Sequence, residues 1–278
     1  MSRVLSPTNL GELWAMLGDE PGCAVFAGGT DLLVRRRAGV AHGDPLVCLE
    51  RIPELREIRA TDGLLRIGAG ATHAACCASP LVAGHAPVLA LAMRRVGSPQ
   101  VRNMGTIGGN ICTASPAGDS LPSLHILKAE VVLRSRESER VLPIADFIRG
   151  PGKTDLRPGE ILMEVRVPSA TEFQVQHFEK VGQRNAQAIA VVSLAALVRL
   201  SRRGTVEEAR LALGSVGPTV VRPSKAEEVL AGRRLSLTAL RQAAGLVRSA
   251  VSPIDDIRAT ADYRREVSGN LLLRLATL

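Results

Sequence analysis

Two glycine-rich segments carry the residues best suited to chemistry. The first, AGGTD at residues 27–31, follows a short apolar run at 23–27. Consecutive glycines permit positive φ angles and add no side-chain bulk, so successive backbone N–H groups can converge on an anion. The start of a following helix adds a favourable partial charge, and the Thr30 hydroxyl can donate to a phosphate oxygen. The Asp31 carboxylate would repel phosphate, so we expect it to cap that helix.

The second segment, NMGTIGGN at residues 103–110, again combines glycines with a hydroxyl and an amide, and SPAGDS follows at 115–120. The two segments lie about 75 residues apart, each after α/β patterning. Together they predict two backbone nests that grip one long phosphate ligand. A dinucleotide with a pyrophosphate fits this spacing better than a mononucleotide, although either glycine turn alone is compatible with a purely structural role.

Other nucleotide and metal motifs are incomplete. GKT at 152–154 ends like a Walker A loop, but the first glycine of that motif would fall at Phe147. A Rossmann motif starting at Gly68 lacks its third glycine, which would fall at His73. No two histidines stand four residues apart, and the five cysteines include no C-x-x-C pair. We therefore expect no metal site in this chain.

The composition is that of an ordinary globular protein: 278 residues, 46% hydrophobic and 22% charged. No apolar run approaches the ~20 residues that cross a bilayer. The N-terminal residues lack a secretory pattern. We expect a cytoplasmic protein without a membrane span, whose odd number of cysteines are free thiols.

The charge balance is basic, with a net charge of +8. Residues 171–278 hold 16 basic and 10 acidic side chains, so most of the excess lies there. This surface could face an acidic protein partner, nucleic acid or only water. Aromatic residues make up 2% of the chain, which disfavours binding to single-stranded nucleic acid by base stacking.

Apolar periodicity predicts the elements that position the two segments. Up to residue 170, strand and helix signals alternate: strands at 23–27, 46–49, 64–67, 131–134 and 161–167, and helices capped by Ser6 or Thr8 and at 32–38, 72–77 and 86–96. Residues 97–122 are predicted to be a loop of small residues. Beyond a boundary at 168–171, strands at 173–180, 188–200 and 209–215 precede helices at 224–231, 237–251 and 260–278. The last helix is expected to bury Tyr263, Val267, Leu271 and Leu275.

In combination, the motifs resemble a known family. AGGTDLL (27–33) and TIGGNICTASPAGDSLP (106–122) are similar to the flavin-binding subunit of the xanthine dehydrogenase family. These are molybdenum-containing hydroxylases, and carbon monoxide dehydrogenase is a relative. SPQVRNMGTIGGN, GPGKTDLRPGEIL, FEKVGQR and ADYRREV occur in family order, so the resemblance covers nearly the whole chain. The phrase GPGKT points to bacterial xanthine dehydrogenase FAD subunits.

The resemblance implies an α+β fold. Residues 1–170 would form a two-lobed FAD-binding domain of the vanillyl-alcohol-oxidase (PCMH) type, with lobes at about 1–58 and 59–170. Residues 171–278 would form a C-terminal domain of the carbon monoxide dehydrogenase flavoprotein type, with a small antiparallel sheet and helices. FAD would lie extended between the lobes. No histidine near the first loop suits covalent attachment, so we expect noncovalent FAD.

The resemblance also assigns cofactor-binding residues. Asp119 would approach hydroxyls of FAD, Leu162 would make an apolar contact, and Lys180 would stabilise reduced flavin by a charge-assisted hydrogen bond. Val96 stands where the family often has a larger side chain. The other expected contacts are Val25, Phe26, Ala27, Gly28, Gly29, Thr30, Asp31 and Leu32 in the first loop, and Thr106, Ile107, Gly108, Gly109 and Asn110 in the second.

The implied function is electron transfer. A molybdenum cofactor on a large partner subunit would hydroxylate the substrate. Electrons would pass through [2Fe-2S] clusters of a small partner to FAD in this chain, and from there to NAD⁺ or another acceptor. The family suggests a dimer of heterotrimers. Two alternatives are a self-sufficient flavin oxidoreductase of the same fold and a non-catalytic assembly protein that retains it.

Overall fold

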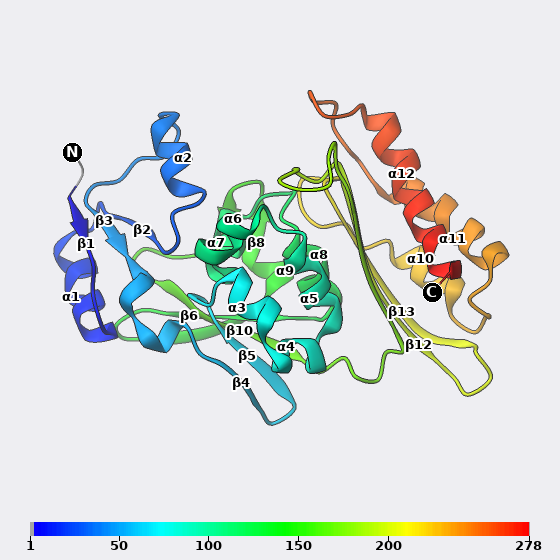
Figure 1. The fold of residues 1–278 in the computed structure, drawn as a ribbon, viewed down its shortest axis with the longest axis horizontal. Helices are drawn as coiled ribbons and strands as arrows, with labels where there is room; N and C mark the ends of the chain where they lie inside the picture. The colour runs from blue at the N-terminus through cyan, green and yellow to red at the C-terminus, as the bar shows by residue number, and fades with distance from the viewer. Residues whose placement is uncertain (1–2, 278) are drawn as a thin grey trace.

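A small parallel sheet forms the N-terminal lobe of the computed structural model, which describes residues 3–277 (Figure 1). Its strand order is β1-β3-β2. Leu13 and Trp14 of the first helix pack on Val47 in the small core of this lobe. Its elements are β1 (Val4–Leu5), α1 (Leu10–Asp19), β2 (Ala24–Phe26), α2 (Leu32–Arg37), β3 (Leu46–Cys48) and the 3₁₀ turns η1 (Leu49–Arg51) and η2 (Pro53–Leu55).

A five-stranded antiparallel sheet, in the order β4-β5-β10-β6-β7, builds the second lobe. Leu65, Val131 and Val165 of its strands share one core with Leu89 and Ile111 of the helices. Its elements are β4 (Ile58–Thr61), β5 (Leu64–Gly68), α3 (His73–Ala78), α4 (Pro80–His85), α5 (Pro87–Arg94), α6 (Pro99–Met104), α7 (Ile107–Thr113), α8 (Ser120–Ile126), β6 (Glu130–Arg134), β7 (Glu139–Pro143), α9 (Ile144–Phe147), β8 (Ile148–Gly150), β9 (Lys153–Thr154) and β10 (Ile161–Pro168).

The prediction that residues 97–122 form a loop is wrong, because α6, α7 and the start of α8 lie there. Ser98 and Thr106 cap α6 and α7 by accepting from the N–H groups of Val101 and Gly109. Glycine weakens a helix, but α7 needs one at Gly108, since a Cβ there would lie 2.6 Å from the Cβ of Ala69. The glycines thus permit close packing of a helix.

The C-terminal sheet is buried on both faces. Its antiparallel strands run in the order β11-β12-β13. Ala195 and Leu197 face the core shared with α5 and α8, while Leu194 and Leu211 face the core shared with the C-terminal helices. Burial on both sides explains why β12 reads as a continuous apolar run. The elements are β11 (Val175–Val181), β12 (Val192–Leu200), β13 (Val206–Gly214), α10 (Ser224–Leu230), α11 (Leu237–Ala250), α12 (Ala261–Leu273) and η3 (Arg274–Thr277).

Two helix details differ from the sequence prediction. Asn9, rather than Ser6 or Thr8, caps α1, while the Thr8 N–H and hydroxyl donate to Glu12. On α12, Tyr263 is 51% exposed. Arg264 takes the buried position instead, because its guanidinium donates to the carbonyls of Val191 and Ser215.

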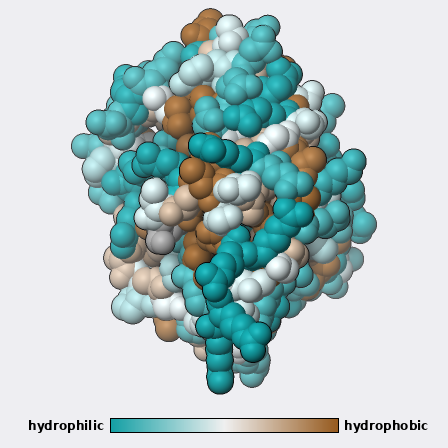
Figure 2. Space-filling model, turned by 90° about the vertical axis from the view of Figure 1, so that its right-hand side faces the viewer, coloured by the Kyte–Doolittle hydropathy of each residue, from teal (hydrophilic) through white to brown (hydrophobic). Residues whose placement is uncertain are grey.

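The face of the molecule that carries α11 and α12 is mostly hydrophilic, with a narrow band of hydrophobic atoms between charged side chains (Figure 2). Among residues 3–277, no helix is long and apolar enough to cross a membrane.

Candidate functional site

The two glycine segments meet along a cleft of about 480 Å³. An isolated β-bridge joins Thr106 of the second segment to Thr72, in the chain that follows β5. Gly28 lies directly against the second segment, because a Cβ there would be 1.7 Å from the carbonyl oxygen of Met104. The loops can approach this closely only while residue 28 has no side chain.

Most of the residues expected to bind the cofactor line this cleft: Val25, Phe26, Ala27, Gly28, Gly29, Thr30, Asp31, Leu32, Val96, Thr106, Gly109, Asn110 and Asp119. Gly108 and Leu162 line an adjoining cavity of about 140 Å³, which shares Val25 and Thr106 with the cleft. Lys180 reaches the site through Asp119. Ile107 lines neither space, because its side chain is fully buried in the core of the second lobe.

The first loop presents open backbone donors. Gly29 has φ +66°, in the left-handed region. Within residues 3–277, the amides of Gly28, Gly29 and Thr30 donate no hydrogen bond to another backbone carbonyl. Three successive unpaired N–H groups beside a cleft are suited to an anion.

The second segment does not form the second nest that its glycines predict. The amides of Ile107 and Gly108 donate to the carbonyls of Ala71 and Ala69, and that of Gly109 donates to the Thr106 hydroxyl. These bonds close the first turn of α7 and fasten it to the chain after β5. The segment therefore lines the cleft with the Thr106 hydroxyl, the Asn110 side-chain amide and Gly109, which has no side chain.

Asp31 does not cap α2, contrary to the sequence prediction. Its carboxylate accepts a 3.2 Å hydrogen bond from the Thr113 hydroxyl on α7 and lies 3.7 Å from the guanidinium of Arg35. Asp31 therefore ties the first loop to the helix of the second segment.

A buried ion pair closes one end of the cleft. The Lys180 Nζ lies 2.6 Å from Asp119 Oδ2 and donates to the carbonyl of Arg95 at 3.1 Å. Both side chains are 8% exposed. Desolvation raises the pKa of Asp119 to about 6, against the attraction of Lys180. Among the described residues, Asp119 Oδ1 has no hydrogen-bond partner, although it is buried.

The sequence did not identify His73, Cys112 and Ile189 as lining residues of the cleft. His73 is 3% exposed, and its Nδ1 has no partner among residues 3–277. Burial lowers the pKa of His73 to about 4, so the imidazole is neutral. In the sequence, His73 is a lone histidine that follows a capping threonine, Thr72. Only the long-range pairing of Thr72 with Thr106 brings His73 to the cleft.

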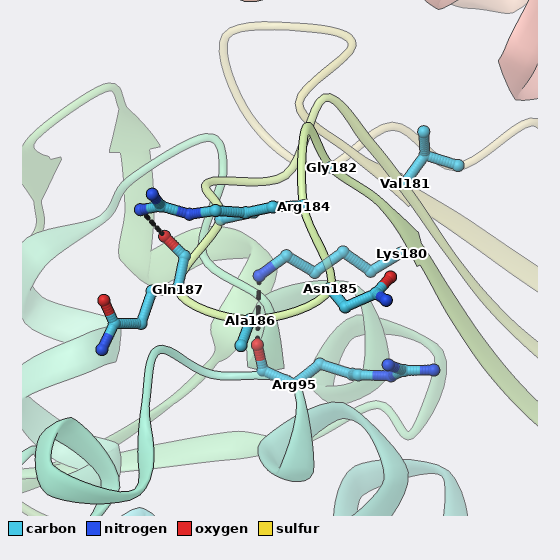
Figure 3. Close-up of a pocket in the computed structure, with 9 residues that line it drawn as sticks. Arg95, Lys180, Val181, Gly182, Arg184, Asn185, Ala186 and Gln187 are labelled. Carbon is cyan, nitrogen blue, oxygen red and sulfur yellow. Dashed lines mark hydrogen bonds between the residues drawn. The ribbon is translucent and has the colours of Figure 1, made fainter.

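A second, basic pocket of about 200 Å³ adjoins the ion pair (Figure 3). Arg95, Lys180 and Arg184 line it together with Asn185 and Gln187 from the β11–β12 connection, and no lining residue is acidic. Arg184 donates to the carbonyl of Gln187 at 2.8 Å, which holds the connection in a closed turn. This pocket suits an anionic group.

Comparison with known proteins decides the family. Residues 1–170 match the family model of the FAD binding domain in molybdopterin dehydrogenase, and residues 177–277 match that of the CO dehydrogenase flavoprotein C-terminal domain. The chain belongs to the FAD-binding medium subunits of the molybdenum hydroxylases.

Relatives support this membership over most of the chain. The carbon monoxide dehydrogenase medium chain of Hydrogenophaga pseudoflava is 34% identical, covering 97% of this chain and 93% of the relative. The xanthine dehydrogenase FAD-binding subunit of Escherichia coli O157:H7 is 34% identical, covering 90% and 86%.

Solved structures agree with the fold. Carbon monoxide dehydrogenase from Hydrogenophaga pseudoflava superimposes with a TM-score of 0.93 at 32% identity, covering 98% of this chain and 95% of that one. Quinoline 2-oxidoreductase from Pseudomonas putida 86 gives 0.93 at 28% identity, covering 100% and 96%. The two-lobed α+β fold and the FAD cofactor expected from the sequence are confirmed, and the chain is an oxidoreductase subunit.

Gly28→Ala is expected to weaken FAD binding about tenfold or more, because overpacking that drives the loops apart typically costs about 1–3 kcal/mol. FAD content per chain and fluorescence titration of the apoprotein measure the effect. Gly18→Ala is the matched control, since a Cβ on Gly18 meets nothing within 4 Å. Equal FAD affinity in the two variants would contradict the steric role of Gly28.

The buried Asp119 carboxyl predicts a pH-dependent stability. Its pKa is raised from 3.8 to about 6 in the folded chain, so between about pH 4 and pH 6 the native state holds a proton that the unfolded state has lost. As the pH rises from about 4 to 6, the free energy of unfolding of the FAD-free protein should fall by on the order of 2–3 kcal/mol relative to that of Asp119→Asn. Urea unfolding across this range measures the difference, and parallel curves for the two proteins would exclude the effect.

Proposed function

We propose that the chain binds FAD noncovalently across the two adjoining cavities, through the residues named from the sequence other than Ile107. We also propose the domain boundary near residue 170, with the FAD-binding domain before it and lobes divided near residue 58. The open amides of Gly28, Gly29 and Thr30 carry this proposal, because they form a nest suited to a pyrophosphate. The orphaned Asp119 Oδ1 suits a hydroxyl donor of the same cofactor.

Bound FAD supplies the ability to take up electrons singly and release them as a pair. We propose that the electrons come from [2Fe-2S] clusters of a small partner subunit, after hydroxylation of a substrate at a molybdenum cofactor on a large partner. The named relatives are medium chains or FAD subunits, which supports an assembly of this kind. We also propose a dimer of heterotrimers. A location in the cytoplasm, where thiols stay reduced, fits the five free cysteines.

Lys180 has a defined part in this function. Asp119 and the Arg95 carbonyl hold its ammonium group in a buried position between the cleft and the basic pocket. A fixed cation there stabilises added negative charge and costs no reorganisation when the charge arrives. Lys180 therefore favours reduction of the cofactor.

The basic pocket supports NAD⁺ as the electron acceptor. Arg95 and Arg184 provide two guanidinium groups for phosphate oxygens, next to the cofactor-facing Lys180. The pocket lies beside the Asp119 end of the cleft, so an acceptor held there is adjacent to that end.

Lys180→Ala should weaken FAD binding about ten- to a hundredfold, since a hydrogen bond to a charged group contributes about 1.5–3 kcal/mol. It should also lower the midpoint potential of the bound cofactor. Fluorescence titration and dye-equilibrated reduction measure the two effects. Lys225→Ala, at an exposed lysine, is the control. The double variant Asp119→Asn/Lys180→Met separates lost cofactor contact from the cost of an unpaired carboxylate. Unchanged affinity and potential in Lys180→Ala would disprove its role.

Arg184→Ala in the assembled complex should raise KM for NAD⁺ about tenfold, because one charge-assisted contact is lost. Turnover with a one-electron dye should stay unchanged. Arg202→Ala, at an exposed arginine of the β12–β13 turn, controls for net charge. An unaltered KM for NAD⁺ would exclude this pocket as the acceptor site.

A chain that oxidises substrate without partner subunits would instead favour the self-sufficient flavoenzyme.

A further inference from the structure

The helix α2 stands apart from the other helices of the molecule (Figure 1). None of its six residues is buried. Leu33, Val34 and, just beyond the helix, Val40 are 48%, 66% and 62% exposed. We call the exposed side chains of Leu33, Val34, Arg35, Arg37 and Val40 the α2 surface.

Such a helix needs a further packing partner. Helices shorter than about 12 residues are marginal in water, and most of their stability in proteins comes from burying an apolar face. Within this chain, the Thr113 hydroxyl donates to the Asp31 carboxylate just before α2, and the Arg36 guanidinium donates to the Gly43 carbonyl. Three exposed aliphatic side chains close together in the sequence offer a partner an apolar surface to bury.

The charge of the α2 surface restricts what can cover it. Arg35 and Arg37 are exposed in the last turn of the helix, next to the aliphatic side chains. Asp31 is the carboxylate that pairs with Arg35, at 3.7 Å. A partner that buries Val34 and Val40 therefore needs an apolar centre with acidic residues around it.

The C-terminal domain, where the sequence places the basic excess, is a weaker candidate. Most of its arginines already lie within 4.0 Å of a carboxylate of the same chain: Arg199, Arg210, Arg222, Arg248, Arg258, Arg264, Arg265 and Arg274. These eight arginines are therefore less available to a partner, although the net excess of the domain, in which its carboxylates are already counted, is unchanged.

We infer that the α2 surface docks the small iron–sulfur subunit that donates electrons to this chain. The inference rests on the proposed electron-transfer function. The α2 helix continues directly from the first glycine loop, and its Leu32 and Arg35 line the cofactor cleft. A protein seated on α2 thus stands at the mouth of that cleft. Electron tunnelling requires the donor to be close to the cofactor, whereas the molybdenum subunit can deliver its electrons through the clusters from farther away.

Val34→Asp tests this docking in the complex coexpressed with its large and small subunits. Val34 does not line the cleft, so FAD content should stay at the wild-type value. A charge buried in the apolar centre should reduce recovery of the iron–sulfur subunit at least about tenfold. Leu237→Asp is the matched control, at a 44% exposed leucine that begins α11 at the other end of the molecule.

Arg37→Glu adds a second measurement. It should slow association with the iron–sulfur subunit several-fold at low salt, and the difference from wild type should shrink as salt is raised. A Val34→Asp complex that keeps the iron–sulfur subunit overturns the inference, and so does one that loses only the large subunit or loses FAD. If the wild-type chain binds FAD but recruits no iron–sulfur protein, the proposed function fails as well.

Discussion

The contact between Gly28 and the Met104 carbonyl is the constraint on which the site depends. It fixes the distance between two segments from different lobes, and it leaves no room for a single additional carbon atom. Because the second segment is bonded internally and to the chain after β5, it behaves as a firm wall. The open amides of the first loop are therefore presented at a fixed distance from that wall. The cleft is preorganised for its cofactor, which reduces the ordering cost of binding.

Two kinds of contact join the second lobe to the C-terminal domain: a shared apolar core and one buried ion pair. Phe178 and Ala195 extend the core of the second lobe into the C-terminal sheet, so most of the contact is ordinary packing. Asp119 and Lys180 cross the same junction as a buried ion pair. Such a pair is costly to desolvate, and hydrophobic residues of similar volume are often no less stable. The proposed function explains its presence better than stability does, because the pair would hold a cation beside the cofactor.

The sequence predicted the composition of the site better than its geometry. AGGTD and TIGGN mark the two loops because both combine glycines with a hydroxyl residue, and TIGGN adds an amide. Local pattern could not reveal that α6 and α7 are helical, because the glycines of α7 are required by Ala69, which is distant along the chain. Ile107 was assigned to the cofactor from its place in the motif, whereas its side chain belongs to the core. His73 depends on a long-range pairing that no local spacing records.

The α2 helix and the C-terminal helices show why net charge along the sequence locates a partner poorly. Both regions are rich in arginine, but eight of the C-terminal arginines are engaged by nearby carboxylates. In α2, Arg35 and Arg37 are exposed beside aliphatic side chains, and Arg35 lies 3.7 Å from Asp31. Charge that is already paired adds little to association, whereas exposed charge around an apolar centre supplies both steering and contact area. The position of α2, between solvent and the first glycine loop, joins that surface to the cofactor cleft. Binding of the cofactor and docking of the electron donor would then use the two ends of one short segment, residues 27–40.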